Sequence, residues 1–151
     1  MDSMRIIDAD ILSYALFQKH DAHPYCWPLL QDGVYGRKSI AIADVNLLEA
    51  YRALVEDYYV GREEASYKLD ALTRSTKIRF LPLTVDIVRK ALEIARVHCV
   101  RSFDATLIAT AEVNKISVVI SNDAHLARLC SERGLVLENP IPKENVKRKC
   151  L

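Results

Sequence analysis

The chain has 151 residues, of which half are hydrophobic and about a quarter are charged. This length and composition fit one globular domain with one sizeable core. The formal net charge of +1 and the pI of about 7.7 exclude a strongly basic surface over the whole chain, so any contact with nucleic acid must be a local patch.

The sequence does not have the features of a membrane or secreted protein. It contains no run of 18 apolar residues, so no membrane span is expected. Its first residues, MDSMRIIDAD, lack the layout of a signal peptide. Its cysteines are scattered without a C-x-x-C pair, which favours reduced thiols in a cytoplasmic protein over a zinc site or a disulfide framework.

Strands and helices alternate in the first half of the chain. In chain order the pattern predicts a strand at 4–7, a helix at 11–16, a loop at 20–33, a strand at 39–43 and a helix from 44 to 61. The loop is predicted because Pro24, Pro28 and Gly33 interrupt the segment. Apolar residues at three- and four-residue steps predict the last helix and place Leu48 on its core side.

The same alternation continues in the second half. The pattern predicts a helix at 63–73, a strand at 78–81, a helix at 84–98, a helix beginning at Ser102, a strand at 117–120, a helix ending at Gly134 and a strand at 135–137. Thr84 and Ser102 are predicted N-caps, and Phe103 is assigned to a buried helix face. This order predicts βαβ units, right-handed crossovers and a mostly parallel sheet.

Three aspartates are predicted to lie at one edge of this sheet. Asp8 and Asp123 follow strands, and Asp104 begins a helix that points back to the same edge. Functional groups of parallel sheets gather beyond the carboxyl ends of the strands. Taken singly, Asp104 is better explained by the helix dipole, and Asp123 is explained equally well by N-capping. Glu49 is a fourth candidate, with a solvated helix face as the open alternative.

Such a group of carboxylates favours a metal site. Converging carboxylates raise one another's pKa, and a bound cation removes this cost. No histidine or cysteine accompanies the acids, and oxygen ligands favour Mg²⁺ or Mn²⁺ over zinc or copper. These ions suit phosphate chemistry, because they lower the pKa of an attacking water and neutralise developing charge.

Four segments carry these acids: IIDADIL with Asp8, NLLEAYRAL with Glu49, SFDATLIATA with Asp104 and VVISNDAHLARL with Asp123. In this order they resemble the acidic motifs of the PIN-domain family, best known from VapC-type toxins of prokaryotic toxin–antitoxin pairs. The resemblance runs from about residue 4 to residue 138, and the third and fourth motifs are its most specific parts.

The resemblance implies a three-layer α/β/α sandwich with a central, mostly parallel sheet of four to five strands. We expect a single domain at 1–140, followed by a flexible basic tail at 141–151. The family further implies an endoribonuclease that depends on Mg²⁺ or Mn²⁺ and acts on RNA. It also implies a possible antitoxin partner and a homodimer, for which Tyr58, Tyr59 and Tyr67 could supply an interface.

The resemblance also assigns roles to residues of this chain. The catalytic set is Asp8, Glu49, Asp104 and Asp123, with the metal held by Asp8, Asp104 and Asp123 and support from Asp10 and Ser121. Asp10 departs from the family, in which Asn, Ser or Thr is commoner at this position. The segment 18–38 and the residues after Pro140 are longer than in compact toxins of this kind.

Two alternatives remain open at the level of the sequence. Asp8-x-Asp10 after a strand is also similar to haloacid-dehalogenase-like phosphatases, with Asp8 as nucleophile, although Leu12 stands where that family has Thr. A non-catalytic domain that binds RNA or protein is the other. Basic candidates for phosphate contacts are Arg37, Lys38 and Arg101.

Overall fold

The computed structural model describes residues 3–143. Its centre is a parallel sheet with the strand order β3-β2-β1-β4-β5. The strands are β1 (Arg5–Ile7), β2 (Ile40–Ala43), β3 (Arg79–Leu81), β4 (Val118–Ile120) and β5 (Val136–Glu138). A five-stranded parallel sheet confirms the predicted fold class. The predicted basic tail lies outside the described residues from position 144 onward.

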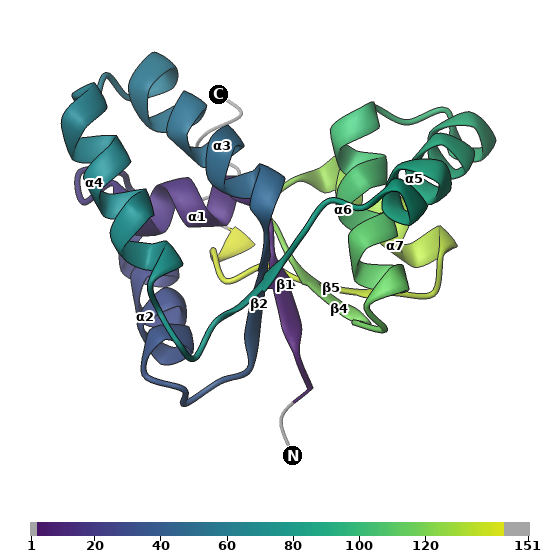
Figure 1. The fold of residues 1–151 in the computed structure, drawn as a ribbon, viewed down its shortest axis with the longest axis horizontal. Coiled ribbons are helices and arrows are strands. Elements are labelled where there is room, and N and C mark those ends of the chain that lie inside the picture. The colour runs from purple at the N-terminus through teal and green to yellow at the C-terminus, as the bar shows by residue number, and fades with distance from the viewer. Residues whose placement is uncertain (1–2, 144–151) are drawn as a thin grey trace.

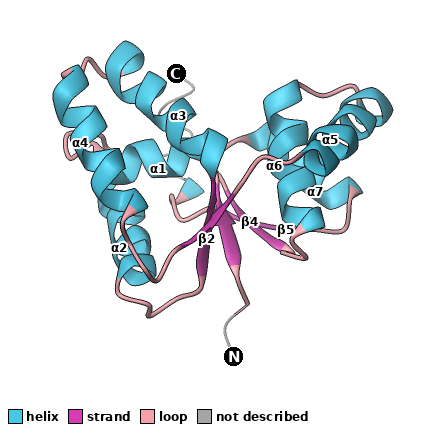
Figure 2. Ribbon diagram, in the orientation of Figure 1, coloured by secondary structure: helices cyan, strands magenta, loops and turns pink. Residues whose placement is uncertain are grey.

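Helices cover both faces of the sheet (Figures 1 and 2). One layer contains α1 (Ala9–Leu16), α2 (His23–Val34), α3 (Asp44–Arg52), the π-helical turn η1 (Ala53–Asp57) and α4 (Arg62–Thr73). The other contains α5 (Val85–His98), α6 (Ser102–Val113) and α7 (Ala124–Glu132). Within residues 3–143, no helix is long and apolar enough to span a membrane.

The alternation of side chains along the strands separates two cores. Ile40 and Ile42 of β2 pack with the layer of α1–α4, whereas Ala41 and Ala43 pack with the layer of α5–α7. Successive side chains of a strand point to opposite faces, so a strand between two helical layers must be apolar throughout. The burial of all four β2 residues meets this requirement.

The predicted loop at 20–33 is wrong, because this segment forms α2. Pro24 lies in the first turn, where proline removes no helical hydrogen bond. Pro28 lies inside the helix, yet the buried side chains of Cys26 and Leu30 hold the segment against the core. Gly33 is needed for packing, since a Cβ there would lie 2.9 Å from the Ile40 side chain. Tertiary packing therefore overrides the local effect of proline.

Four smaller expectations also differ from the structure. The predicted helix 44–61 ends as α3 at Arg52 and continues into η1. Its buried face carries Asn46, Ala50 and Leu54 at four-residue spacing, which leaves Leu48 72% exposed. Similarly, Phe103 of α6 is 63% exposed, and Ser102 is the first helical residue rather than the N-cap. Apolar residue type alone therefore did not identify the inward faces.

Two predicted helix boundaries are confirmed. The Thr84 hydroxyl accepts a hydrogen bond from the Ile87 N–H at 3.2 Å and caps α5. Gly134 follows α7 with a φ of 73°, a left-handed conformation that favours glycine. These caps fix where α5 begins and where the chain turns from α7 into β5.

Candidate active site

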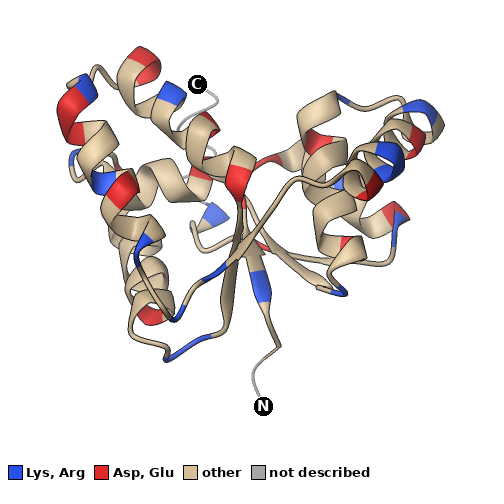
Figure 3. Cartoon of the chain, viewed as in Figure 1, with Lys and Arg blue, Asp and Glu red and all other residues tan. Residues whose placement is uncertain are grey.

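A cleft of about 650 Å³ lies at the carboxyl ends of the central strands. Acidic segments gather where the two helical layers meet above the sheet (Figure 3). The acids that line the cleft are Asp8, Asp10, Glu49, Asp57, Asp104 and Asp123. The structure thus brings all five predicted acids together from separate parts of the chain, while their catalytic and metal-binding roles stay predictions.

Asp8 is held at the end of β1 by both its backbone and its carboxylate. Its N–H donates to the Ile120 carbonyl at 2.9 Å, which extends the pairing of β1 with β4. Its Oδ1 accepts from the Ala9 N–H at 2.7 Å and caps α1. Its Oδ2 accepts from the Ser121 hydroxyl at 2.7 Å. The carboxylate therefore has a fixed position between two strands.

Ser121 links Asp8 to Asp123. Its side chain is fully buried, and besides donating to Asp8 it accepts a hydrogen bond from the Asp123 N–H at 3.0 Å. Asp123 in turn caps α7, because its Oδ1 accepts from the His125 N–H at 2.9 Å. The N-cap alternative for Asp123 is therefore correct, and the same residue also faces the cleft.

Asp10 is bound to the backbone on two sides. Its Oδ1 accepts from the Ile11 N–H at 2.6 Å, and its Oδ2 accepts from the Asn122 N–H at 3.0 Å. Burial, followed by the negative charge of Asp8, raises the pKa of Asp10 to about 8. Asp10 therefore ties α1 to the segment after β4.

Glu49 reaches the cleft from α3, and Asp104 reaches it from the first turn of α6. Burial raises the pKa of Glu49 above its ordinary value, and the nearby charge of Asp8 adds to this effect. The pKa of Asp8 is also raised, chiefly by burial and against the opposing effect of its hydrogen bonds. These shifts are typical of functional sites, where carboxylates are grouped and poorly solvated.

Arg101 is the basic residue that meets these acids directly. Its Nη2 lies 3.2 Å from Oδ2 of Asp104 and 3.2 Å from Oδ2 of Asp123. The two other basic candidates for phosphate contacts, Arg37 and Lys38, lie before β2 and pair with Asp32. They do not line the cleft.

The donor set fits a hard divalent cation. It consists of carboxylate oxygens with one buried hydroxyl, which is the chemistry that Mg²⁺ and Mn²⁺ prefer. Among the described residues, no three acidic, histidine or cysteine side chains form a ready-made ligand cage. This does not conflict with magnesium, which is usually held by one or two carboxylates and several waters. The guanidinium between Asp104 and Asp123 shows that this pair accepts a cation.

The sequence did not reveal the aromatic wall of the cleft. Tyr14 and Tyr58 line it, and their rings belong to a cluster with Phe17 and His20, in which Tyr14 stacks on His20 at 4.2 Å. Burial raises the pKa of Tyr14, so this phenol stays neutral over the ordinary pH range. Tyr14 lies four residues after Asp10 on α1, and this spacing was the available signal.

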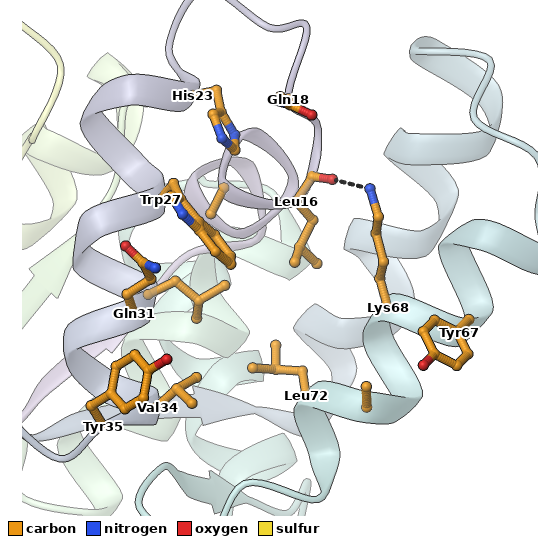
Figure 4. A pocket seen from close by; sticks show the side chains of 13 residues that line it. Leu16, Gln18, His23, Trp27, Gln31, Val34, Tyr35, Tyr67, Lys68 and Leu72 are labelled. Atoms are coloured by element: carbon orange, nitrogen blue, oxygen red, sulfur yellow. Dashed lines mark hydrogen bonds between the residues drawn. The ribbon is translucent and has the colours of Figure 1, made fainter.

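A second cavity, of about 560 Å³, lies among α1, α2 and α4 (Figure 4). Its wall is largely apolar and includes Trp27, Leu30 and Leu72. On one side, the Lys68 ammonium donates to the Leu16 carbonyl at 3.0 Å. This recess contains none of the predicted catalytic acids.

The fold agrees with the comparisons to known proteins. The sequence model of the PIN domain matches residues 5–132, so the chain belongs to the PIN-domain family. This match leaves the phosphatase alternative without support. No curated protein matches the sequence at a significant level.

Several solved structures share the fold at low sequence identity. A sarcin–ricin loop cleaving toxin, VapC20 of Mycobacterium tuberculosis, has a TM-score of 0.70 and 20% identity, with 87% of this chain and 96% of that chain covered. VapBC2 of Rickettsia felis, bound to a DNA fragment from its promoter, has a TM-score of 0.64 and 16% identity, with 90% of this chain and 98% of that chain covered. A toxin–antitoxin complex from Klebsiella pneumoniae has a TM-score of 0.63 and 16% identity, with 91% of this chain and 98% of that chain covered.

Proposed function

We propose that this protein is a divalent-metal-dependent endoribonuclease that hydrolyses RNA phosphodiester bonds as the toxin of a toxin–antitoxin pair. The observation that carries the proposal is the convergence of Asp8, Glu49, Asp104 and Asp123 on one open cleft in a PIN-domain chain. Asp8, Asp104 and Asp123 would hold Mg²⁺ or Mn²⁺, with Ser121 and Asp10 in support. When bound, the ion supplies a water of lowered pKa and neutralises charge on the phosphate.

The protein residues have separate tasks in this reaction. Ser121 keeps the Asp8 carboxylate in place through its 2.7 Å hydrogen bond. Glu49 is suited to take a proton from the attacking water, because its raised pKa brings it closer to neutral pH. The water adds to phosphorus in line with the departing 3′ oxygen. That oxygen leaves with a proton, so the products carry a 5′-phosphate and a 3′-hydroxyl.

Two kinds of protein partner follow from the same proposal. Similar structures are described as toxin–antitoxin complexes, which supports an antitoxin for this chain. The apolar recess of Figure 4, with Trp27 40% exposed, offers a surface for it. For the homodimer, α5 presents Val85, Val88 and Leu92 to solvent on the side opposite its buried residues. Light scattering at micromolar concentration tests the dimer.

Cleavage of a defined RNA by the purified full chain tests the proposal. We expect cleavage with Mn²⁺, none after EDTA, and a loss of about a hundredfold or more for Asp104→Asn, because metal coordination and water activation both suffer. Glu112→Gln is the matched control, since Glu112 lies on the same helix but outside the cleft. Activity that survives EDTA, or 2′,3′-cyclic phosphate ends, would contradict this mechanism. RNA binding without any cleavage would favour the non-catalytic alternative.

A further inference from the structure

Arg101 connects two acids that come from different elements. Its Nε and Nη2 both lie 3.2 Å from Oδ2 of Asp104, and the same Nη2 lies 3.2 Å from Oδ2 of Asp123. Asp104 belongs to the first turn of α6, whereas Asp123 caps α7. One guanidinium nitrogen therefore contacts the carboxylates of both helices, across 22 positions of sequence between Arg101 and Asp123.

The exposure of the three side chains is unequal. The carboxylates are only 17% and 26% exposed, but the Arg101 side chain is 71% exposed. Arg101 therefore covers the acids from the solvent side. The positively charged guanidinium offsets one of the two negative charges of the pair.

The other arginine of the cleft does not share this task. Arg52 lies 3.7 Å from Glu56 and 3.7 Å from Asp57, and it forms ion pairs with these two residues. Within residues 3–143, the salt bridges of Asp104 and Asp123 both run to Arg101. Two close carboxylates without a cation repel each other. Arg101 therefore occupies space beside both carboxylates that a cation held by this pair would need.

We propose that Arg101 is a built-in counter-cation that competes with the divalent metal for Asp104 and Asp123. The inference rests on the proposed metal-dependent function. Without metal, Arg101 offsets part of the negative charge of the pair and covers the two carboxylates on the solvent side. A divalent ion must displace the guanidinium before it binds both acids. Arg101 thus sets the metal concentration at which the site fills, and it leaves the acids as the metal arrives.

Mn²⁺ binding to the full chain, measured by calorimetry, tests this competition without reference to cleavage. We expect Arg101→Gln to lower the Kd for Mn²⁺ by about three- to fivefold, because an exposed ion pair typically changes an equilibrium by up to about fivefold. Arg101→Gln should also increase the rise in melting temperature that a fixed Mn²⁺ concentration produces. Far-UV circular dichroism of each variant confirms that it is folded.

Two control variants separate site occupation from a general effect of charge. Arg52→Gln removes one positive charge from the same cleft, and Arg128→Gln removes one from α7, where Arg128 pairs with Glu132. Both should keep the wild-type Kd within about twofold, because exposed charges are screened. An Arg101 variant with unchanged or weaker Mn²⁺ binding would overturn the competition, and so would an equal gain in Arg52→Gln. If neither wild type nor Arg101→Gln binds Mn²⁺, the proposed metal-dependent function fails instead.

Discussion

Helix α6 carries an acid near each end, and the two acids have contrasting surroundings. Near its C-terminus, Glu112 accepts hydrogen bonds from Nη2 and Nε of Arg133 at 2.6 and 2.9 Å, and Lys90 lies 3.3 Å away. Near its N-terminus, Asp104 faces a cleft lined by six acids and two arginines. The pKa of Glu112 is lowered by its Arg133 hydrogen bonds, whereas burial raises the pKa of Asp8 and Glu49.

The difference shows how structural and functional acids can be told apart within one helix. Glu112 of α6 pairs with Lys90 of α5 and with Arg133, the C-cap residue of α7, so its negative charge has two cationic partners. The cleft concentrates negative charge that its two arginines do not balance. Such a group costs stability unless a cation binds, so stability alone does not explain it. We therefore expect substitutions of Glu112 and Asp104, near the two ends of α6, to have opposite effects.

The gain in unfolding free energy on Mn²⁺ binding should differ most strongly between variants at the two ends of α6. Wild-type protein should gain about 2.7 kcal/mol of unfolding free energy when Mn²⁺ is a hundredfold above its Kd. Glu112→Gln should keep this gain, whereas Asp104→Asn should lose most of it, because one of the proposed ligands becomes a neutral amide. Chemical unfolding with and without Mn²⁺ measures the difference.

If Asp104 serves only the helix dipole, the result will be different. Asp104→Asn then costs a few tenths of a kcal/mol, and the full response to Mn²⁺ remains. An unchanged metal response in this variant would falsify the assignment of Asp104 to the metal site.

The pH dependence of stability should have opposite signs in the two regions. The pKa of Glu112 is lowered on folding, so its contribution is present above the unfolded pKa of about 4.5 and is lost as the pH falls through the folded pKa. Glu112→Gln should therefore cost about 1–2 kcal/mol near pH 7, and less in acid. Its side chain is 15% exposed, which keeps the ion pair partly shielded.

Asp10 should behave in the opposite way. Its pKa is raised to about 8, so between about pH 4 and pH 8 the folded protein retains a proton that the unfolded chain loses, and stability falls as the pH rises. In metal-free buffer, Asp10→Asn should gain stability relative to wild type over this range. Unfolding curves at pH 5 and pH 8 provide the test, and a wild-type advantage that grows with pH would contradict it.

The sequence predicted the parts of the fold that local patterns determine. Short apolar runs identified every strand of the sheet. Burial between two helical layers explains this for the central strand β2, whereas the edge strands β3 and β5 keep exposed residues. The edge position of Asp8 followed from its place directly after such a run. Helix ends were predicted where a single residue is decisive, as with Thr84 and Gly134.

Features that depend on distant contacts were not predicted. The pairing of Arg101 with Asp123 spans 22 residues, and the link from Ser121 to Asp8 spans 113. The π-turn η1 and the course of α2 depend on packing rather than on propensity. Leu48 was assigned to the core because it is apolar, although a cleft edge also accepts such a residue.

The smallest predicted effect concerns the hydroxyl of Ser121, which supports the cleft without facing it. Ser121 is fully buried and links the carboxylate of Asp8 to the backbone of Asp123. Ser121→Ala removes both hydrogen bonds, so we expect a loss of about 1 kcal/mol in unfolding free energy. Residues that orient metal ligands affect affinity, and the Kd for Mn²⁺ should rise by about tenfold.

Ser13→Ala is the matched control for this substitution. Ser13 is 1% exposed and lines the same cleft, but its hydroxyl donates to the backbone carbonyl of Asp10 at 2.8 Å and to no carboxylate. It should lose a similar free energy of unfolding and keep the wild-type Kd for Mn²⁺. If both variants bind Mn²⁺ equally well, Ser121 contributes to packing alone. If Mn²⁺ binding is weaker in Ser121→Ala alone, the Ser121 hydroxyl positions Asp8 for the metal.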